Sequence, residues 1–385
     1  MNVKPLFAPL FAAIALLAAG ACSQTRNGNA AGADSAPGTP PPAPSVSDST
    51  PSTQPPAPGL TLALAGDIMM GTTYPDSIHG SHLPADGGSQ LFSDVAGLLR
   101  GADIAAANLE GTLLDSCGIV KKCADPKVCY AFRTPTKYVD NLSAAGIDFV
   151  SIANNHINDF GKEGIQSTIK TLHDAGIAYA GLSGRCETVT LLRDGRRIGF
   201  AAFGHSGGTP SIMDYARVRR TVSGLKKDCD IVVVSFHGGG EGAGFEHVPH
   251  APEEAFGDKR GDVEKFAHTA VDAGADIVYG HGPHVLRAAE LYRDRLILYS
   301  LGNFCTPYRV SLKESAGEAP VVTASLAADG RFQSGRIHSF IQQPGRGPRL
   351  DSGNRAARRI RTLTRQDFPS TPLHISDDGT LTPGK

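Results

Sequence analysis

Residue types that bind metal ions follow the predicted buried strands of this sequence. Several apolar runs are each followed at once by a carboxylate, a carboxamide or an imidazole. These residues are Asp67, Asn108, Glu110, Asn154, Asn155, His156, His237, Glu241, His281, His284 and Asn303. A single Asp or His after a strand is usually a turn, cap or core residue. Agreement among five strand ends favours a metal site instead, because ligands of open α/β sheets bind at the carboxyl ends of the strands.

The size of this set predicts two divalent ions. Oxygen and imidazole ligands suit Zn, Mn or Fe, and the sequence offers two carboxylates, one carboxamide and three histidines as ligands. Asp67 or Glu110 could bridge the two ions. Two ions close together clamp the attacking and leaving oxygens of a phosphoryl displacement and lower the pKa of a bound water.

His156 is the candidate catalytic residue outside the ligand set, where it could stabilise charge or protonate a leaving group. Asp159 lies three residues later and could orient the His156 ring. Glu241, four residues after His237, is a further catalytic candidate. The carboxamides at strand ends are candidates for binding substrate: Asn108, Asn154 and Asn303.

Short apolar runs alternate with amphipathic helical patterns from residue 60 onward, which predicts an α/β architecture. The predicted strands span residues 61–65, 103–107, 148–152, 177–180, 198–203, 231–236, 276–279 and 296–300. Several are apolar along their whole length, as strands buried on both faces are. Helical patterns end at Gly146, Gly176 and Gly274, where glycine favours a left-handed cap. Asp262 is the predicted N-cap of the last of these helices.

The end of the chain is predicted to be less regular. Residues 319–343 contain two strand patterns around Asp329 and Gly330, a dipeptide typical of hairpin turns. Residues 344–385 are rich first in Arg and then in Ser, Thr and Pro. We therefore expect one domain over residues 60–343, followed by an irregular C-terminal tail over 344–385.

The N-terminal residues 1–21 are predicted to be a lipoprotein signal peptide. Lys4 is the only charged residue before a nearly apolar run at 6–19, and small residues precede Cys22. This pattern favours cleavage before Cys22 and its acylation; an ordinary signal peptide followed by a chance Cys is the alternative. Residues 22–59, rich in Ser, Thr, Gly, Ala and Pro, are predicted to be a disordered tether. We therefore expect a lipid-anchored protein of the cell envelope that faces the periplasm or the cell exterior, with the outer membrane favoured.

Cysteine usage agrees with export. Six cysteines remain beside Cys22: Cys117, Cys123, Cys129, Cys186, Cys229 and Cys305. An even number of cysteines in an exported protein favours disulfide bonds, although spacing does not give their pairing. Zinc binding by the first three is disfavoured, because their spacing is wrong for a CxxC clamp.

Six motifs in chain order resemble the bacterial capsule synthesis family CapA/PgsA, which is linked to poly-gamma-glutamate. The motifs are AGDIM at 65–69, NLE at 108–110, ANNH at 153–156, His237 with Glu241, GHGPHV at 280–285 and YSLGNF at 299–304. The resemblance implies a calcineurin-like metallophosphoesterase fold, a four-layer α/β/β/α sandwich. It implies metal ligands at Asp67, Glu110, Asn155, His237, His281 and His284. It also implies association with the membrane and with subunits of a polymer synthase or exporter.

The sequence departs from this family around residues 238–242. Family members often carry Trp-Gly after the motif histidine and an aromatic residue after the glutamate, whereas this chain has glycine at 238, 239, 240 and 242. We expect these glycines to open space near the site. The segments 117–129 and 246–261 are longer than expected and could form the rim of a pocket.

Several functions remain open. The preferred one is a metal-dependent hydrolase that acts on a phosphoester or on an amide of an anionic polymer. The alternative is a non-catalytic accessory protein that binds polymer or synthase subunits. A periplasmic nucleotidase is disfavoured, because such enzymes usually carry His two residues after the first Asp and this chain carries Met69. The formal net charge of -1, without a basic stripe, gives no support for a nucleic-acid partner.

Overall fold

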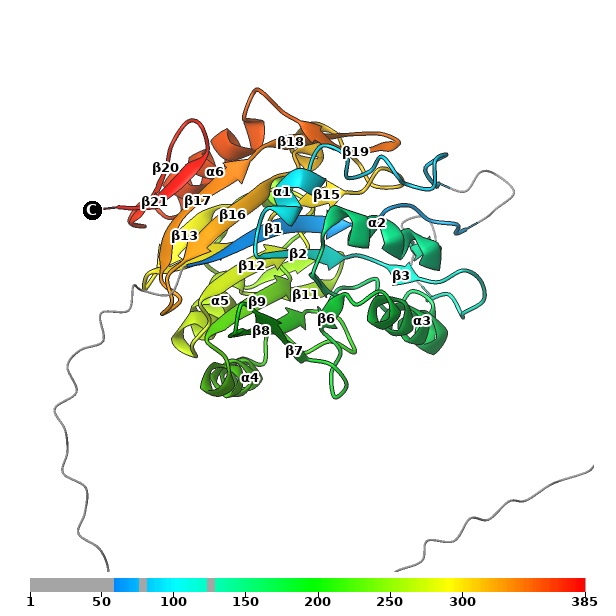
Figure 1. Ribbon diagram of the computed structural model, residues 1–385, viewed down its shortest axis with the longest axis horizontal. Helices are drawn as coiled ribbons and strands as arrows, with labels where there is room; N and C mark the ends of the chain where they lie inside the picture. Colours follow the sequence, from blue (N-terminus) through cyan, green and yellow to red (C-terminus); the bar gives the residue numbers. More distant parts are fainter. Residues whose placement is uncertain (1–58, 76–81, 123–128, 385) are drawn as a thin grey trace, which may run out of the picture. The chain divides into compact units, whose positions relative to one another are not determined.

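The computed structural model describes residues 59–75, 82–122 and 129–384, and two large sheets dominate it (Figure 1). The first sheet has the strand order β20 (Leu373–Ile375), β21 (Thr380–Pro383), β17 (Phe332–His338), β16 (Val321–Leu326), β1 (Leu60–Ile68), β2 (Ile104–Leu109), β5 (Phe149–Ser151) and β6 (Ala178–Ala180), and β15 (Asn303–Cys305) also pairs with β1. The second sheet has the order β13 (Ala289–Tyr292), β14 (Arg295–Leu298), β12 (Ile277–His281), β9 (Ile231–His237), β8 (Arg196–Gly204) and β7 (Thr188–Arg193).

Six α-helices and three small ladders complete the described part of the chain. The helices are α1 (Ala96–Arg100), α2 (Val139–Ala145), α3 (Gly161–Asp174), α4 (Tyr215–Asp228), α5 (Val263–Asp272) and α6 (Arg355–Asp367). The ladders pair β3 (Thr112–Leu113) with β4 (Arg133–Thr134), β10 (Glu253–Ala255) with β11 (Asp258–Gly261), and β18 (Phe340–Gln343) with β19 (Arg346–Leu350). Short 3-10 turns occur at Thr136–Tyr138, Ala243–Phe245 and Glu314–Gly317.

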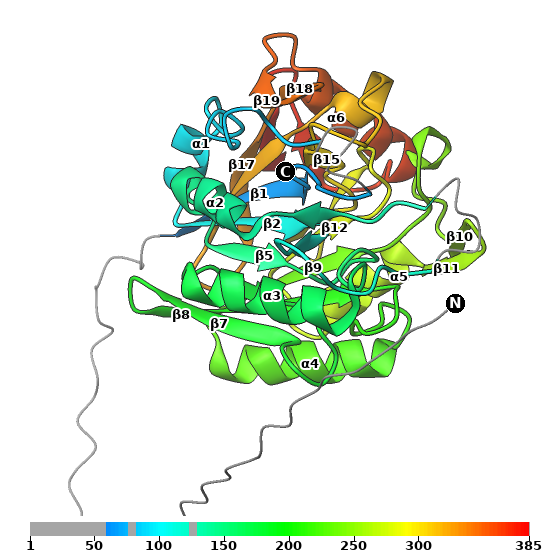
Figure 2. The same ribbon diagram turned by 90° about the vertical axis from the view of Figure 1, so that its right-hand side faces the viewer.

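The three largest hydrophobic cores of the described residues confirm the predicted four-layer sandwich. One core lies between the sheets, where Phe149 of β5 stacks on Phe200 of β8 with ring centroids 4.2 Å apart. A second core joins the first sheet to α1, α2 and α3, and a third joins the second sheet to α4 and α5. In Figure 2, strands of both sheets lie between α2 and α4. The central strands of each sheet are therefore buried on both faces, as their continuous apolar patterns predict.

The predicted strands and helix ends are confirmed, whereas the strands that were missed are edge strands such as β7 and β13, strands of the small ladders, and short strands such as β15 and β21. The eight predicted runs correspond to β1, β2, β5, β6, β8, β9, β12 and β14, and the predicted hairpin is β16–β17. Gly146, Gly176 and Gly274 all have positive φ, and Asp262 caps α5 by accepting a hydrogen bond from the Lys265 N–H. Edge strand β7 alternates between partly buried and exposed residues, so it lacks the apolar run by which the central strands were recognised.

The prediction of an irregular C-terminal tail is wrong. Residues 346–383 form β19, α6, β20 and β21, and the last two strands extend the first sheet beside β17. Ala356, Ala357 and Ile360 on α6 join the core between the sheets, while Arg359 on the other side pairs with Glu318 at 2.7 Å. The Arg-rich composition concealed an ordinary amphipathic helix pattern, so the domain continues to the end of the described residues.

The N-terminal predictions fall outside the described residues. These are the signal peptide at 1–21, the acylated Cys22 and the tether before residue 59. Among the helices that the structure describes, none combines the length and apolar composition needed to cross a membrane.

Disulfide bonding is more limited than the even number of cysteines suggested. Cys117, Cys186, Cys229 and Cys305 carry free thiols. Cys129 is disulfide-bonded, and Cys123 lies outside the described residues. The buried thiols of Cys229 and Cys305 pack in hydrophobic cores, so here cysteine acts as a small apolar residue.

An ion pair between α5 and β13 gives a prediction about pH. His268 Nε2 lies 2.9 Å from Glu290 Oε2. Burial lowers the pKa of His268, but the hydrogen bond and charge of Glu290 outweigh it and raise the pKa above its usual value, which is about 6.5. The protonated pair therefore stabilises the fold fully below about pH 6.5 and loses its effect as pH rises through the folded pKa.

We expect His268→Gln to remove this pH-dependent contribution. Urea unfolding of wild type and variant at about pH 5.5 and about pH 8.5 measures it. The difference in unfolding free energy between the two proteins should shrink at the higher pH. An equal difference at both pH values would contradict the assignment.

Candidate metal centre

The carboxyl ends of strands from both sheets meet at one place. In the first sheet, Asp67 at the end of β1 lies in register with Asn108 of β2 and with Asn303 of β15. In the second sheet, His281 at the end of β12 lies in register with His237 at the end of β9. The topology therefore brings together residues that are more than two hundred positions apart in the sequence, as the strand-end rule predicts.

Asp67, Glu110 and His284 form the compact centre of the site. Their ligand atoms lie within 4.8 Å of one another. Asp67 Oδ2 is 3.1 Å from His284 Nδ1, and Asp67 Oδ1 is 3.3 Å from His281 Nδ1. His284 Nε2 is 3.5 Å from Glu110 Oε1. His284 has a φ of 58°, a left-handed conformation that is costly for a side chain-bearing residue and that is found at functional sites.

The predicted ligands fit divalent cations because their buried polar atoms lack other partners. Within the described residues, no hydrogen bond is made by Glu110 Oε1, Asn155 Oδ1, His281 Nε2 or either ring nitrogen of His237. A buried polar atom without a partner costs about 1–3 kcal/mol, so a cluster of them is unfavourable unless an ion binds there. The donor set of carboxylates, one carboxamide and imidazoles suits Zn, Mn or Fe.

Asn108 and Asn154 hold this cluster in place through side-chain hydrogen bonds. Asn108 Nδ2 donates to Asp67 Oδ1 at 2.8 Å, and Asn154 Nδ2 donates to Asn108 Oδ1 at 3.0 Å. Asn154 Oδ1 accepts from the His156 N–H at 3.1 Å. Both side chains are fully buried. The expectation that Asn108 and Asn154 contact substrate is therefore corrected: their amides are committed to neighbouring site residues.

The side chain of Asn303 likewise makes its hydrogen bonds within the protein, although it borders the pocket. Its Oδ1 lies 3.1 Å from His284 Nδ1, and its Nδ2 donates to the carbonyl oxygens of His284 and Ala316, each at 3.2 Å. It therefore orients His284 and anchors the segment that contains Ala316.

His156 and Asp159 form the predicted dyad. His156 Nδ1 lies 2.8 Å from Asp159 Oδ2, which also accepts from the Phe132 N–H at 2.7 Å. The Phe132 ring packs on the imidazole with centroids 4.4 Å apart. His156 Nε2 faces the centre, 3.8 Å from Glu110 Oε1. Lys121, which sequence analysis did not single out, pairs with Asp159 Oδ1 at 2.6 Å.

Glu241 also reaches the centre, where its Oε1 lies 3.8 Å from His284 Nε2, the nitrogen that faces Glu110. Its Oε2 accepts a hydrogen bond at 2.9 Å from Arg260, a residue only 3% exposed. Arg260 belongs to β11, so the segment 246–261 contributes to the site by holding Glu241. The sequence pattern did not indicate Arg260, because its role depends on how the hairpin β10–β11 folds back.

Of the four glycines at 238, 239, 240 and 242, only Gly242 has the open space that was expected, because no atom lies within 4 Å of a Cβ at that position. A Cβ at position 240 would lie 1.9 Å from the Phe245 ring, and one at position 239 would lie 2.7 Å from Arg287 Nη1. Gly239 also has a φ of 85°, which favours glycine. Neighbouring atoms therefore fill the volume that larger residues would occupy at positions 238 to 240, whereas Gly242 borders the pocket described below.

Arg287 fixes this turn through a buried ion pair. It is 1% exposed, and its Nη1 and Nη2 donate hydrogen bonds to the two carboxylate oxygens of Glu253 at 2.9 and 2.6 Å.

We expect Arg287→Met to destabilise the protein by about 3 kcal/mol, because Glu253 would stay buried without its partner. Urea unfolding measures this. The double variant Arg287→Met with Glu253→Gln should recover part of the loss, and a double variant as unstable as the single one would contradict the explanation.

His205 is a further strand-end residue that sequence analysis missed. It follows β8 and lies beside His237, with ring centroids 5.6 Å apart. The same signal that identified His237, an imidazole directly after a buried strand, also applies to His205. Its Nδ1 lies 3.2 Å from the His237 carbonyl oxygen and its Nε2 lies 3.3 Å from Ser206 Oγ, so it supports the site without facing the cluster.

Burial and neighbouring charges shift the pKa values of this cluster in opposite directions. Burial raises the pKa of Glu110 to about 8. Burial opposes the charged forms of Asp67 and His284, but their contacts outweigh it, so the pKa of Asp67 is low and that of His284 rises to about 10. Burial lowers the pKa of His237 well below its usual value, which keeps this imidazole in the neutral form that binds metals.

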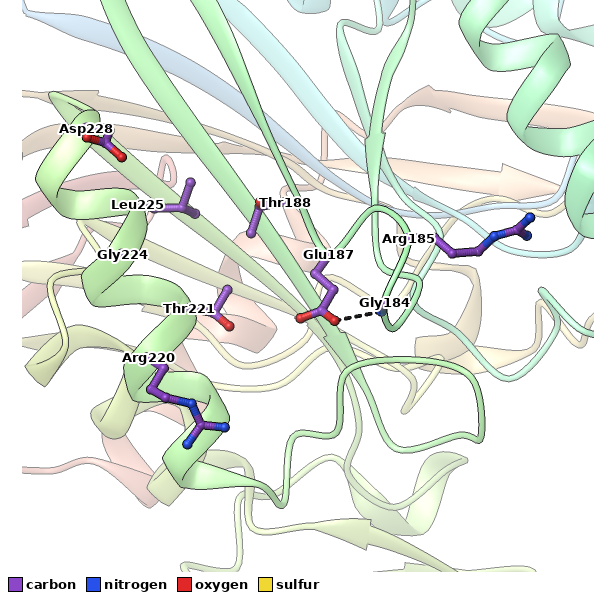
Figure 3. A pocket seen from close by; sticks show the side chains of 9 residues that line it. All are labelled: Gly184, Arg185, Glu187, Thr188, Arg220, Thr221, Gly224, Leu225 and Asp228. Atoms are coloured by element: carbon purple, nitrogen blue, oxygen red, sulfur yellow. Dashed lines mark hydrogen bonds between the residues drawn. The ribbon is translucent and has the colours of Figure 1, made fainter.

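The centre opens into a pocket of about 430 Å³. His156, Glu241, His284 and Asn303 border it, together with Tyr130, Phe132 and residues from the segment 309–316. A second hollow of about 550 Å³ lies between α4 and residues 184–188 (Figure 3). That hollow contains none of the predicted site residues, so the pocket at the metal centre is the candidate substrate site.

Comparison with known proteins identifies the family. The family described as "Bacterial capsule synthesis protein PGA_cap" matches residues 61–308. The "Capsule biosynthesis protein CapA" of Bacillus anthracis is 28% identical over 264 residues, which is 64% of this chain and 59% of that protein. The "PGA biosynthesis protein CapA" of Bacillus subtilis is 30% identical over 263 residues, 64% of this chain and 63% of that protein. The match thus spans less than two thirds of either Bacillus protein.

A third relative and a solved structure are also similar to this chain. The "Probable polyglutamine synthesis accessory protein" of Mycobacterium tuberculosis is 31% identical over 304 residues, 65% of this chain and 75% of that protein. The crystal structure of the calcineurin-like phosphoesterase YfkN from Bacillus subtilis aligns with a TM-score of 0.45 and 12% identity, covering 81% of this chain and 97% of that one. The family match covers most of the described domain and includes Asp67, His156 and His284. This chain belongs to the bacterial capsule synthesis protein family.

Proposed function

We propose that this protein is a metal-dependent hydrolase that acts on an anionic polymer or its phosphorylated precursor during synthesis or export of a capsule-type polymer. The main support for this proposal is the cluster of buried polar atoms that lack hydrogen-bond partners. This cluster lies beside the His156–Asp159 dyad and opens into a pocket. The names of the Bacillus relatives support the connection with capsule and polyglutamate.

The residues divide into three roles. Asp67, Glu110, Asn155, His237, His281 and His284 would hold one or two divalent cations. The cations would polarise the group under attack and acidify a water molecule. His156, with Asp159 accepting the Nδ1 proton, offers Nε2 for proton transfer to a leaving group. Glu241, held by Arg260, is a second carboxylate close to His284 Nε2.

The proposal places the protein in the cell envelope. Acylation of Cys22 would anchor it to a membrane, with the outer membrane favoured, and residues 22–59 would hold the domain away from the surface. Polymer synthase or exporter subunits are the proposed protein partners.

Metal content and turnover test the proposed function together. The full chain is purified, its metal content is measured by mass spectrometry, and hydrolysis of a chromogenic phosphodiester is followed in the same samples. We expect about two equivalents of Mn, Fe or Zn and turnover that a chelator removes. Folded protein that binds no metal and stays inactive after reconstitution would contradict the proposal and favour an accessory protein that binds polymer.

A further inference from the structure

The pocket at the metal centre has one wall beyond the family match. The match ends at residue 308, and the wall runs from Arg309 to Ala316 between β15 and β16. Asn303 ties this wall to the centre, because its Nδ2 donates both to the Ala316 carbonyl oxygen and to the carbonyl oxygen of His284. The position of the wall is therefore coupled to that of a metal ligand.

The wall holds its side chains in a costly backbone conformation. Arg309 and Glu314 have φ values of 65° and 52°, in the left-handed region that side chain-bearing residues avoid at about 1–2 kcal/mol each. Such residues concentrate at binding sites, where the surrounding structure holds them in place.

Two cations on this wall have no carboxylate partner. Within the described residues, neither Arg309 nor Lys313 forms an ion pair, whereas Glu241, which also borders the pocket, is paired with Arg260. The Arg309 guanidinium lies over the Tyr130 ring, 5.7 Å from its centroid, and this contact fixes its direction. Glu314 is the acidic residue of the wall, and in the described part of the chain it forms no ion pair with either cation. The cations thus remain available to a ligand.

We propose that Arg309 and Lys313 form a subsite for an anionic group next to the group that reacts at the metal centre. The substrate class is then an acidic chain with a carboxylate or phosphate on the neighbouring unit. Tyr130 and Phe132 would contact its less polar parts. Arg is well suited to this role, because its planar guanidinium binds carboxylate and phosphate through two parallel hydrogen bonds. This inference rests on the proposed function for the reacting step, but the binding it describes needs no turnover.

Binding of labelled oligomers to the full chain tests the subsite. The probes are a short γ-linked glutamate oligomer, a linear polyphosphate of similar charge and a neutral glutamine oligomer, measured by fluorescence anisotropy at low and moderate salt. The test variant is Arg309→Gln with Lys313→Gln. The matched control is Arg185→Gln with Arg220→Gln, which removes two cations from the hollow in Figure 3.

We expect the test variant to bind one of the acidic oligomers at least about tenfold more weakly, and the control variant to bind like wild type. The oligomer that is affected more identifies carboxylate or phosphate as the recognised group. Equal losses in both variants, no loss in either, or no binding of either acidic oligomer by wild type would overturn the subsite. Wild-type turnover of the small phosphodiester is measured separately, so failure of the proposed function is distinguished from failure of the subsite.

Discussion

Replacing His237 with Ala is expected to remove divalent metal from the protein and, with it, hydrolytic turnover. His237 is fully buried, and both of its ring nitrogens lack hydrogen-bond partners, so the structure gives the imidazole no other polar role. Loss of residues that merely orient a ligand lowers metal affinity by about 10- to 100-fold. Loss of a ligand should exceed that range. Metal content by mass spectrometry and affinity by calorimetry measure the effect directly.

His205→Ala is the matched control for this prediction. It removes a histidine that packs beside His237, but its two ring nitrogens already face the His237 carbonyl oxygen and Ser206 Oγ. We expect this variant to keep its metal. Normal metal content in His237→Ala, or equal loss in both variants, would show that His237 is not a ligand. Thermal unfolding of each variant is also measured in the presence of a chelator. This measurement separates loss of a metal ligand from loss of the fold.

The convergence of the candidate ligands could be predicted because most of them follow the ends of buried strands. Asp67 and His281 stand at the ends of continuous apolar strands, and parallel strands bring such ends together whatever their separation in sequence. His205 obeys the same rule and was overlooked. The sandwich was predictable for a related reason, since strands buried on both faces require helices outside both sheets.

Residues held by irregular segments could not be predicted in this way. Lys121 reaches Asp159 from a loop without regular structure, and Arg260 reaches Glu241 only because β10–β11 folds back. The space beside Gly240 depends equally on the turn that places Phe245 there. These contacts arise from loop conformation and not from strand periodicity, so residue type and spacing did not indicate them.

His156→Gln is expected to lower kcat by about 100- to 10,000-fold while the protein keeps its metal. The size is that of losing a positioned general acid or base. Metal should remain, because His156 Nε2 lies 3.8 Å from Glu110 Oε1 and the compact ligand group of Asp67, Glu110 and His284 does not include it. Steady-state kinetics on the chromogenic phosphodiester and metal analysis of the same samples measure both. His173→Gln, a substitution of an exposed histidine on α3, is the control and should leave both unchanged.

Asp159→Asn separates proton transfer by His156 from the orientation of its ring. The amide oxygen can still accept from the Phe132 N–H, but the carboxylate that pairs with Lys121 and faces His156 Nδ1 is lost. We expect kcat to fall by about 10- to 100-fold with little change in KM, because the substituted residue does not border the pocket. A fall as large as that of His156→Gln would mean that the dyad acts only as a unit. Loss of metal in either variant would instead assign His156 to the ligand set and leave the general acid to Glu241.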